Sequence, residues 1–338
     1  MVDGSGEILT KHGSVRGVKA SADIAPLESR LKLFRWIEPR PSPELEIGRF
    51  LTARRFARTP ALVGALEYVR PEFEPGALAV VQVRIKHQGS GWDVAIDDLR
   101  RYDERVAARV KRSGARDEMG APEWIDGPPS FCAAIEQWYL PGATVLGRRT
   151  AELHAALTGD PGTAFAPEPL DAEDLGALAN RMRAHAEVSL DLLAVRLPSL
   201  DDVSRAKAET VLRARDVVLA RFEAIRPLGD AGQRIRIHGD YHLGQVLRTE
   251  EEFMILDFDG DPSQSIAERR AKQSPLKDVA GMIRSYGYAA HAALFAFGVH
   301  APDDYAALEP WAHLGALGRR RLHGGVQRRA RPIAAAPA

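Results

Sequence analysis

The residues best suited to chemistry lie in one stretch, residues 235–262, with the sequence IRIHGDYHLGQVLRTEEEFMILDFDGDP. It combines two histidines and four aspartates with short apolar runs. Two of these runs, residues 246–248 and 253–256, are typical of β-strands and are separated by a polar turn at residues 249–252. The stretch therefore predicts a hairpin with polar side chains gathered at its open end.

The hairpin predicts a metal site. If Leu247 lies opposite Ile255, the same register places Gln245 beside Asp257 at the open end. Such carboxylate and amide oxygens suit Mg²⁺, which takes one or two carboxylates together with substrate phosphates. Asp240 precedes Gln245 by five residues and is left to accept a proton from an incoming hydroxyl. This pattern indicates phosphoryl transfer.

Two other interpretations of these residues compete. Asp and Gly are the commonest turn formers, so the motif is also typical of a solvated surface hairpin. His238, Asp240 and His242 alternate in sequence, as zinc ligands on one face of a strand do. Against zinc, Gly239 and Tyr241 suit a loop better than a strand. The full spacing from H-G-D through the amide to D-F-D favours the magnesium site.

The elements that must position this site divide into a β-rich part and a helical part. Residues 31–37, 61–68 and 77–85 are rich in apolar and β-branched residues and predict one small sheet. A helix is predicted from Pro43, capped by Ser42. Later helices are predicted at residues 94–112, 147–157, 172–195 and 200–225. We therefore expect an α+β fold with a small β-rich lobe and a larger, mainly helical lobe.

Composition and charge limit the possible partners. The chain has 46 basic and 46 acidic residues, but the segment after Ala312 holds six arginines and no acidic residue. The remainder has 40 basic against 46 acidic residues, a balance that disfavours nucleic-acid binding through phosphates. A single cysteine and the lack of a membrane-length apolar run or secretory leader indicate a cytoplasmic location. We expect no nucleic acid and no membrane as partners.

HGDYHLGQ followed by ILDFDGDP resembles the catalytic and metal loops of the aminoglycoside-phosphotransferase branch of the protein-kinase-like fold, and is most similar to those of bacterial maltokinases. The similarity extends to LKLFRWIEPRPSPELEIGRFLT, LGRRTAELHAAL and AERRAKQSPLKDVAGMIRSYGYAAH, in collinear order. The resemblance implies a bilobal kinase-like fold with an N-terminal lobe at 1–88, a helical C-lobe at 89–312 and a basic tail at 313–338.

The same resemblance implies an activity and its partners. A maltokinase transfers phosphate from ATP, with Mg²⁺, to maltose and forms maltose 1-phosphate, in metabolism linked to trehalose and glycogen. A trehalose synthase domain, fused or separate, is the implied partner. A related kinase for glucosamine, an aminoglycoside or another small alcohol is the first alternative. A catalytically impaired fragment that binds nucleotide without turnover is the second.

Carried over by position, the resemblance makes Asp240 the catalytic base and assigns the metal to Gln245 and Asp257. It makes Lys32 the lysine that binds the nucleotide phosphates, with Glu46 as its ion-pair partner. A lysine and a glutamate that merely extend into solvent are the competing interpretation of this pair.

Further residues receive supporting roles from the resemblance. His238 orients the catalytic loop, and Asp278 either holds that loop from below or caps its own helix. Asp259 supports a second metal or the substrate, or is a solvated turn residue. QVRIKHQGSGW corresponds to the hinge that meets adenine. Candidates for binding sugar hydroxyls, or else for a solvated charged face, are Arg269, Arg270, Lys272, Arg284 and Tyr288.

Two segments depart from the family pattern. GSGEILTKHGSVRG, before Lys32, lacks the glycine-rich motif that covers phosphates. Family members continue after residue 312 with an aromatic helix, whereas this chain has HLGALGRRRLHGGVQRRARP. With permitted codons, a one-base shift turns that segment into TWERWVGAAFMAGYSGGLD, an amphipathic helix of the expected kind. We therefore hypothesise a truncated or frameshifted copy whose tail, from about His313, is unstructured.

Overall fold

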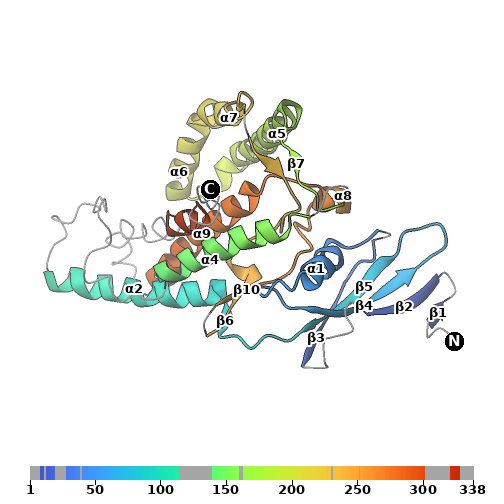
Figure 1. Cartoon of the computed structure of the whole chain (residues 1–338). Coiled ribbons are helices and arrows are strands. Elements are labelled where there is room, and N and C mark those ends of the chain that lie inside the picture. The colour runs from blue at the N-terminus through green and yellow to red at the C-terminus, as the bar shows by residue number, and fades with distance from the viewer. Residues whose placement is uncertain are drawn as a thin grey trace, which may run out of the picture. The chain divides into compact units, whose positions relative to one another are not determined.

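The computed structural model describes residues 8–10, 13–19, 28–38, 40–113, 139–159, 163–229, 231–250, 252–300 and 320–327 (Figure 1). The chain divides into two compact units. One consists of Met1–Ala166 with Ile235–Ala338, and the other of Pro167–Arg234. Within the described residues, no helix is both long and apolar enough to cross a bilayer.

The first unit begins with an antiparallel sheet in the order β1-β2-β4-β5-β3. Its strands are β1 (Ile8–Thr10), β2 (Gly13–Lys19), β3 (Ser29–Leu33), β4 (Leu62–Val69) and β5 (Gly76–Val83). The predicted small sheet is confirmed, with β4 and β5 close to their expected bounds. The strand expected at 31–37 is shorter at its end, since β3 stops at Leu33.

Helix α1 (Pro43–Ala53) lies against this sheet, as Figure 1 shows. Leu45 of α1 packs with Leu62, Ala65 and Val80 in a small apolar core. The predicted start of the helix at Pro43 is confirmed. Ser42 occupies the N-cap position, but the predicted capping bond is wrong, because its side chain makes no hydrogen bond to the helix.

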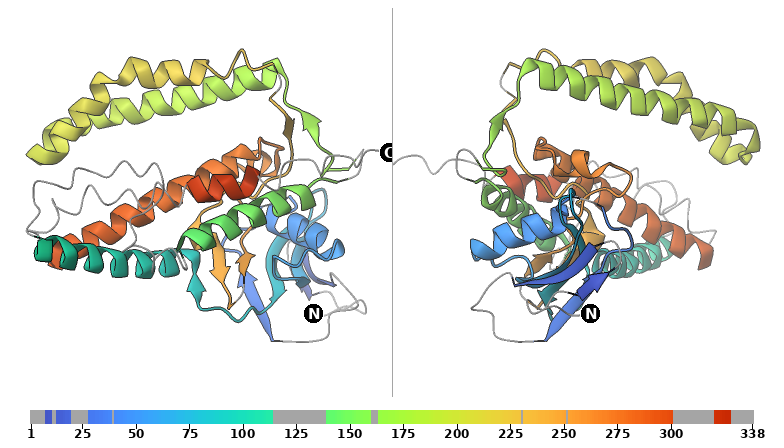
Figure 2. Two further views of the ribbon diagram at one scale, coloured as in Figure 1. Left: turned by 60° about the vertical axis from the view of Figure 1, so that its left-hand side comes forward. Right: turned by 90° about the vertical axis from the view of Figure 1, so that its right-hand side faces the viewer.

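The rest of the first unit is mainly helical. Its elements are β6 (Gly89–Ser90), α2 (Gly91–Ser113), α4 (Tyr139–Ala156), η3 (Leu243–Gln245), β9 (Val246–Arg248), β10 (Phe253–Ile255), α8 (Ile266–Arg270) and α9 (Leu276–His300). Figure 2 shows α2 and α9 side by side. Their apolar faces join α4 and the β9–β10 hairpin in one core that includes Leu99, Leu146, Ile255 and Met282. This core supports the loops that follow residue 237.

The hairpin register differs from the expected one by one residue. Val246 lies opposite Ile255 and Leu247 opposite Met254, so Leu247 does not face Ile255. The cause is the turn at residues 249–252, which is closed by a 2.9 Å hydrogen bond from the Thr249 N–H to the Glu252 carbonyl. The strand expected at 235–237 is reduced to one bridge between Ile235 and Gln273.

The second unit contains β7 (Glu168–Pro169), α5 (Ala172–Arg196), η2 (Leu197–Ser199), α6 (Asp202–Arg213), α7 (Arg215–Glu223) and β8 (Gln233–Arg234). Helix α5 begins with a reciprocal capping box between Asp171 and Asp174, and its prediction is confirmed. The single helix expected at 200–225 is wrong. The chain leaves helical geometry at Ala214, which separates α6 from α7.

Part of the basic tail is ordered. Residues 320–327 form a helix, and Leu322 is 0% exposed within the core of the first unit. The approach to α4 is close at two glycines. A Cβ atom on Gly147 would clash with the Leu322 carbonyl oxygen, and one on Gly325 would clash with the Thr144 carbonyl oxygen. The helix at residues 320–327 differs from the unstructured tail expected at 313–338. The other residues of that tail lie outside the described part of the chain. The frameshift concerns the gene and stays a prediction.

Candidate functional site

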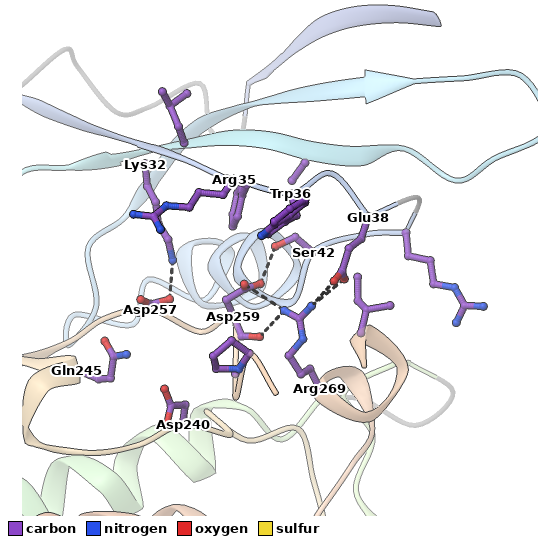
Figure 3. Close-up of a pocket in the computed structure, with 17 residues that line it drawn as sticks. Lys32, Arg35, Trp36, Glu38, Ser42, Asp240, Gln245, Asp257, Asp259 and Arg269 are labelled. Atoms are coloured by element: carbon purple, nitrogen blue, oxygen red, sulfur yellow. Dashed lines mark hydrogen bonds and ion pairs between the residues drawn. The ribbon is translucent and has the colours of Figure 1, made fainter. Parts of the chain in front are cut away.

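A cleft of about 380 Å³ in the first unit collects the predicted polar residues. Lys32 enters it from β3, and Asp240, Gln245, Asp257 and Asp259 enter it from the loops around the β9–β10 hairpin (Figure 3). The hairpin still delivers Gln245 and Asp257 together, although their strands pair in a different register. The N–H of Leu256, the residue before Asp257, donates a 2.9 Å hydrogen bond to the Gln245 carbonyl, which keeps Gln245 and Asp257 close together.

Lys32 is held by two carboxylates. Its Nζ lies 2.5 Å from Oδ1 of Asp257 and 3.5 Å from Oε2 of Glu44, whose other oxygen accepts a 2.9 Å bond from Gln82. Burial lowers the pKa of Lys32, but Glu44 and Asp257 outweigh it and raise that pKa above its ordinary value. Burial also raises the pKa of Glu44, which is 1% exposed. Lys32 is therefore a fixed cation at the wall of the cleft.

The predicted partner of Lys32 was wrong. Glu46 binds Arg270 and Arg236 instead, and Glu44 takes the place expected for it. Residues two positions apart on an α-helix point about 200° away from each other, so only one of Glu44 and Glu46 can face Lys32. The sequence offered both candidates, and the orientation of α1 on the sheet decided between them.

The loop that carries Asp240 is held by a buried carboxylate. Asp278 accepts the N–H groups of His238 and Gly239 at 3.0 and 2.9 Å, and its Oδ2 lies 2.9 Å from Nε2 of His154. Burial raises the pKa of Asp278, but the bond with His154 and the other partners outweigh it and hold that pKa below its ordinary value. Of the two predicted alternatives, the contacts show that Asp278 holds the loop.

His238 connects this loop to the strand before Asp257. Burial lowers the pKa of His238, so the ring is neutral near pH 7. Nε2 is 2.8 Å from the Leu256 carbonyl oxygen and therefore donates to it, which leaves Nδ1 to face the Asp240 N–H at 3.4 Å. The predicted orienting role agrees with these contacts. They also oppose the zinc interpretation, and the described residues contain no cluster of three metal-binding side chains of His, Cys, Asp or Glu.

The surroundings of Asp240 favour its ionised form. His242, whose Nε2 lies 3.7 Å from Oδ2 of Asp240, lowers the pKa of that carboxyl, and Gln245 adds to the effect. The preceding Gly239 has a positive φ of 85°, and a Cβ there would touch Gly260. The loop therefore depends on glycine to bring Asp240 near the loop that carries Asp257.

Asp257 and Asp259 have different surroundings. Asp257 has a φ of 61°, a left-handed conformation that is uncommon for residues other than glycine. Asp259 is bound at 3.1 Å by Nη1 of Arg269 and at 3.4 Å by the hydroxyl of Ser42. Asp259 is thus a partner of Arg269 and not a freely solvated turn residue. Its predicted role toward metal or substrate stays a prediction.

A second cavity of about 810 Å³ also reaches Asp240. Its wall includes Trp92, His242, Asp261, Lys277, Arg284 and Tyr288. Arg284 donates through Nε to the Tyr288 hydroxyl at 2.9 Å. Among the predicted sugar-binding residues, Arg284 and Tyr288 lie at this second cavity. Arg269 lines the first cleft but is bound there by Glu38, and Arg270 is bound by Glu46.

Sequence reasoning missed three of the residues that build this site: Glu44, His154 and the structural role of Arg269. Glu44 had a usable signal, since it lies on the same helix as the residue chosen in its place. His154 and Arg269 are more than 100 and 200 residues from Asp278 and Glu38, the respective partners that reveal them. No local pattern marks such pairs.

Comparisons with known proteins place the chain near glucosamine kinases. No family model matches it. It is 32% identical to a glucosamine kinase of Streptacidiphilus jiangxiensis over 241 residues, which are 70% of this chain and 44% of that protein. It is 34% identical to a glucosamine kinase of Mycolicibacterium smegmatis over 152 residues, 44% of this chain and 33% of that protein. The chain thus spans less than half the length of these curated relatives.

Solved structures show the same similarity in three dimensions. One crystal form of a glucosamine kinase aligns with a TM-score of 0.65 and 24% identity, over 93% of this chain and 67% of that one. A glucosamine kinase in complex with glucosamine, ADP and inorganic phosphate aligns with a TM-score of 0.64 and 24% identity, over 96% and 68%. The chain therefore shares its fold with these kinases.

Proposed function

We propose that the chain is an ATP- and Mg²⁺-dependent kinase that phosphorylates a hydroxyl of glucosamine or a closely related small sugar. One observation carries the proposal: Asp240 lies where two cavities meet. The first cavity contains Lys32, which suits nucleotide phosphates, and Gln245 and Asp257, which suit the accompanying Mg²⁺. The second cavity is left for an acceptor. The similarity to glucosamine kinases in sequence and fold supports it.

The cleft residues fit the nucleotide and its metal. Oxygen ligands are what Mg²⁺ prefers, and Gln245 and Asp257 present an amide and a carboxylate to one space. When bound there, Mg²⁺ neutralises charge on the phosphates. Lys32 already has a carboxylate partner in Glu44, so it keeps its position when Asp257 engages a metal. These side chains would therefore hold Mg-ATP with little rearrangement.

Asp240 would act on the acceptor. Its lowered pKa keeps the carboxylate ionised at neutral pH, the state that accepts a hydrogen bond from a hydroxyl. As the hydroxyl oxygen forms its bond to the γ-phosphorus and the bond to the bridging oxygen of ADP breaks, the hydroxyl proton passes to Asp240. The Asp278 carboxylate and the neutral His238 ring hold the loop during this transfer.

The family resemblance and the comparisons with known proteins favour different acceptors. The resemblance implied maltose, with a trehalose synthase partner and a place in glycogen metabolism. The relatives described above are named glucosamine kinases, and they give maltose and that partner no support. Glucosamine, first an alternative, becomes the leading acceptor. We also propose that the sheet with α1 and the helical remainder of the first unit correspond to the two lobes of a kinase.

A panel assay tests the proposal. The purified chain with Mg-ATP is assayed for ADP release with glucosamine, maltose, glucose and kanamycin. We expect glucosamine to give the highest kcat/KM, and Asp240→Asn to lower kcat by a factor of about 10²–10⁴, the range for a general base. Asp202→Asn, at a fully exposed position of the second unit, is the matched control and should retain activity.

The possible outcomes test the kinase activity, the role of Asp240 and the identity of the acceptor separately. A folded chain that binds Mg-ATP but phosphorylates none of the four acceptors would contradict the kinase proposal and favour a nucleotide-binding fragment. Turnover that survives in Asp240→Asn would remove Asp240 as the base. Preference for maltose would restore the acceptor that the sequence first implied.

A further inference from the structure

Helix α8 ends in two adjacent arginines, and each binds a different glutamate near the small sheet. Arg269 binds Glu38, which lies between β3 and α1, and Arg270 binds Glu46 on α1. Figure 3 shows Arg269 between Glu38 and Asp259. We call these four residues, Arg269, Arg270, Glu38 and Glu46, the arginine clasp. Glu38 and Arg269 line the cleft, whereas Glu46 and Arg270 do not.

Arg269 joins Glu38 to the loop that contains Asp257. Its Nη2 lies 2.8 and 2.7 Å from the two Glu38 carboxylate oxygens. Its Nη1 donates to the Asp259 carbonyl at 3.0 Å and lies 3.1 Å from the carboxylate of the same residue. The side chain is 7% exposed and packs on Gly260, where a Cβ would lie 3.3 Å from its Cγ. This guanidinium therefore fixes the backbone two residues beyond Asp257.

Arg270 fixes α1. Its guanidinium binds both carboxylate oxygens of Glu46, at 3.1 and 3.0 Å, and Arg236 binds the same carboxylate at 3.0 Å. Arg236 is buried, so Glu46 is held on one side by an immobile cation. Glu44 lies two residues before Glu46 on the same helix. The rotation of α1 that satisfies Arg270 and Arg236 is thus the rotation that turns Glu44 toward Lys32.

We propose that Arg269 and Arg270 are positioning residues for the nucleotide. One arginine locates the loop of Asp257, the other locates the helix of Glu44, and the two are neighbours on one short helix. The clasp thereby sets the spacing between Lys32 and Asp257 across the cleft. This inference rests on the proposed kinase function, and it states which substrate the clasp serves.

The geometry separates this role from a general structural one. Arg270 does not line the cleft or the second cavity, so its loss removes no contact to either substrate. A displacement of about 1 Å at a reacting group can cost a factor of 10² in rate. Because the clasp acts on Lys32 and Asp257, its loss should weaken nucleotide binding and leave acceptor binding unchanged. A structural role would instead lower the amount of active protein and leave both KM values as they are.

The test is a set of variants assayed with both substrates varied. We expect Arg270→Gln to raise the KM for Mg-ATP about tenfold and to change the KM for the sugar less than twofold. Arg270→Lys keeps the charge but loses the two-pronged geometry, so it should restore only part of the affinity. Arg215→Gln, which breaks an exposed pair in the second unit, is the matched control.

A double-mutant cycle adds a second criterion. Glu46→Gln should raise the KM for Mg-ATP as well, and the double variant Arg270→Gln with Glu46→Gln should be no worse than the more severe single variant, because the two residues act through one contact. Strictly additive effects would overturn the clasp as a unit. So would a KM for Mg-ATP that changes no more than in the Arg215 control, or an equal rise in both KM values.

Calorimetric titration with Mg-ADP makes the test independent of turnover. If the chain binds Mg-ADP but phosphorylates no acceptor, the proposed activity fails while the clasp is still decided by the dissociation constant of Arg270→Gln. A tenfold weaker binding supports the clasp, and unchanged binding overturns it. If the unaltered chain does not bind Mg-ADP at all, both proposals are overturned.

Discussion

The two units of the chain use charged side chains differently. In the unit of Met1–Ala166 and Ile235–Ala338, Glu44, Arg236 and Asp278 are 1%, 2% and 1% exposed. In the unit Pro167–Arg234, no charged side chain among the described residues is buried to that degree. There, ion pairs such as Arg215 with Asp191 lie in solvent, with side-chain exposures of 35% and 66%.

The difference shows where the chain bears an energetic cost. Taking an ion out of water costs several kcal/mol, which only well-placed partners offset. Exposed ion pairs contribute about 0–1 kcal/mol and require no such compensation. The three most buried ions of the first unit lie near the cleft: Glu44 binds Lys32, Asp278 holds the loop of Asp240, and Arg236 binds Glu46 of α1. The cost of these three ions is borne where they hold the residues of the cleft in place.

The largest expected effect is at Asp278. Asp278→Ala leaves the His238 and Gly239 N–H groups and the His154 ring without their acceptor. Breaking a buried charged network in this way costs about 3–5 kcal/mol. Urea denaturation of the two proteins measures the loss. Asp278→Asn keeps one acceptor oxygen and should lose less, and a cost under about 1 kcal/mol for the alanine variant would show that the loop does not depend on this carboxylate.

Asp103 is a second buried carboxylate of the same unit, and we expect its replacement to raise the free energy of unfolding at high pH, whereas the replacement of Asp278 lowers it. Among the residues described, Oδ2 of Asp103 on α2 has no hydrogen-bond partner. Burial, and then Glu104, raises the pKa of Asp103 to about 7, from an ordinary value of 3.8. Because the folded pKa is the higher one, the stability linked to this proton is present below pH 3.8 and is lost as the pH rises through about 7.

Asp103→Asn removes that dependence. We expect the variant to be more stable than the unaltered protein by about 2 kcal/mol at pH 8, and the difference to shrink toward zero near pH 4. Urea denaturation at several pH values measures it. A variant that is less stable at pH 8 would mean that Asp103 has a cationic partner among the residues not described.

The smallest effect is expected in the second unit. Arg215→Gln breaks the 2.7 Å pair with Asp191, but both side chains stay hydrated. The expected change in the free energy of unfolding is below about 0.5 kcal/mol. A loss above about 1.5 kcal/mol, measured in the same urea experiment, would remove the contrast between the two units.

Much of the site could be predicted from local sequence. Asp240, Gln245 and Asp257 lie within one hairpin and its flanking loops, so their convergence follows from short-range chain geometry. Gln245 and Asp257 lie together as predicted although the expected register was wrong by one residue, because β9 begins and β10 ends at the same edge of the hairpin. Lys32 was also predicted, from the family resemblance. Its partner was not, since Glu44 and Glu46 are equally available on α1.

The sequence by itself determined which functional groups this protein has and which of them lie near one another along the chain. Only the tertiary structure decided the partners separated by hundreds of residues, namely Asp257 for Lys32, Glu38 for Arg269 and Glu46 for Arg270. It also decided that part of the basic tail forms a helix, through the close contact of Gly147 with residues 320–327. The physical reason is the same in each case. A buried charge or a close backbone approach is stabilised by whatever lies across the interface, and a local pattern cannot encode which segment that is.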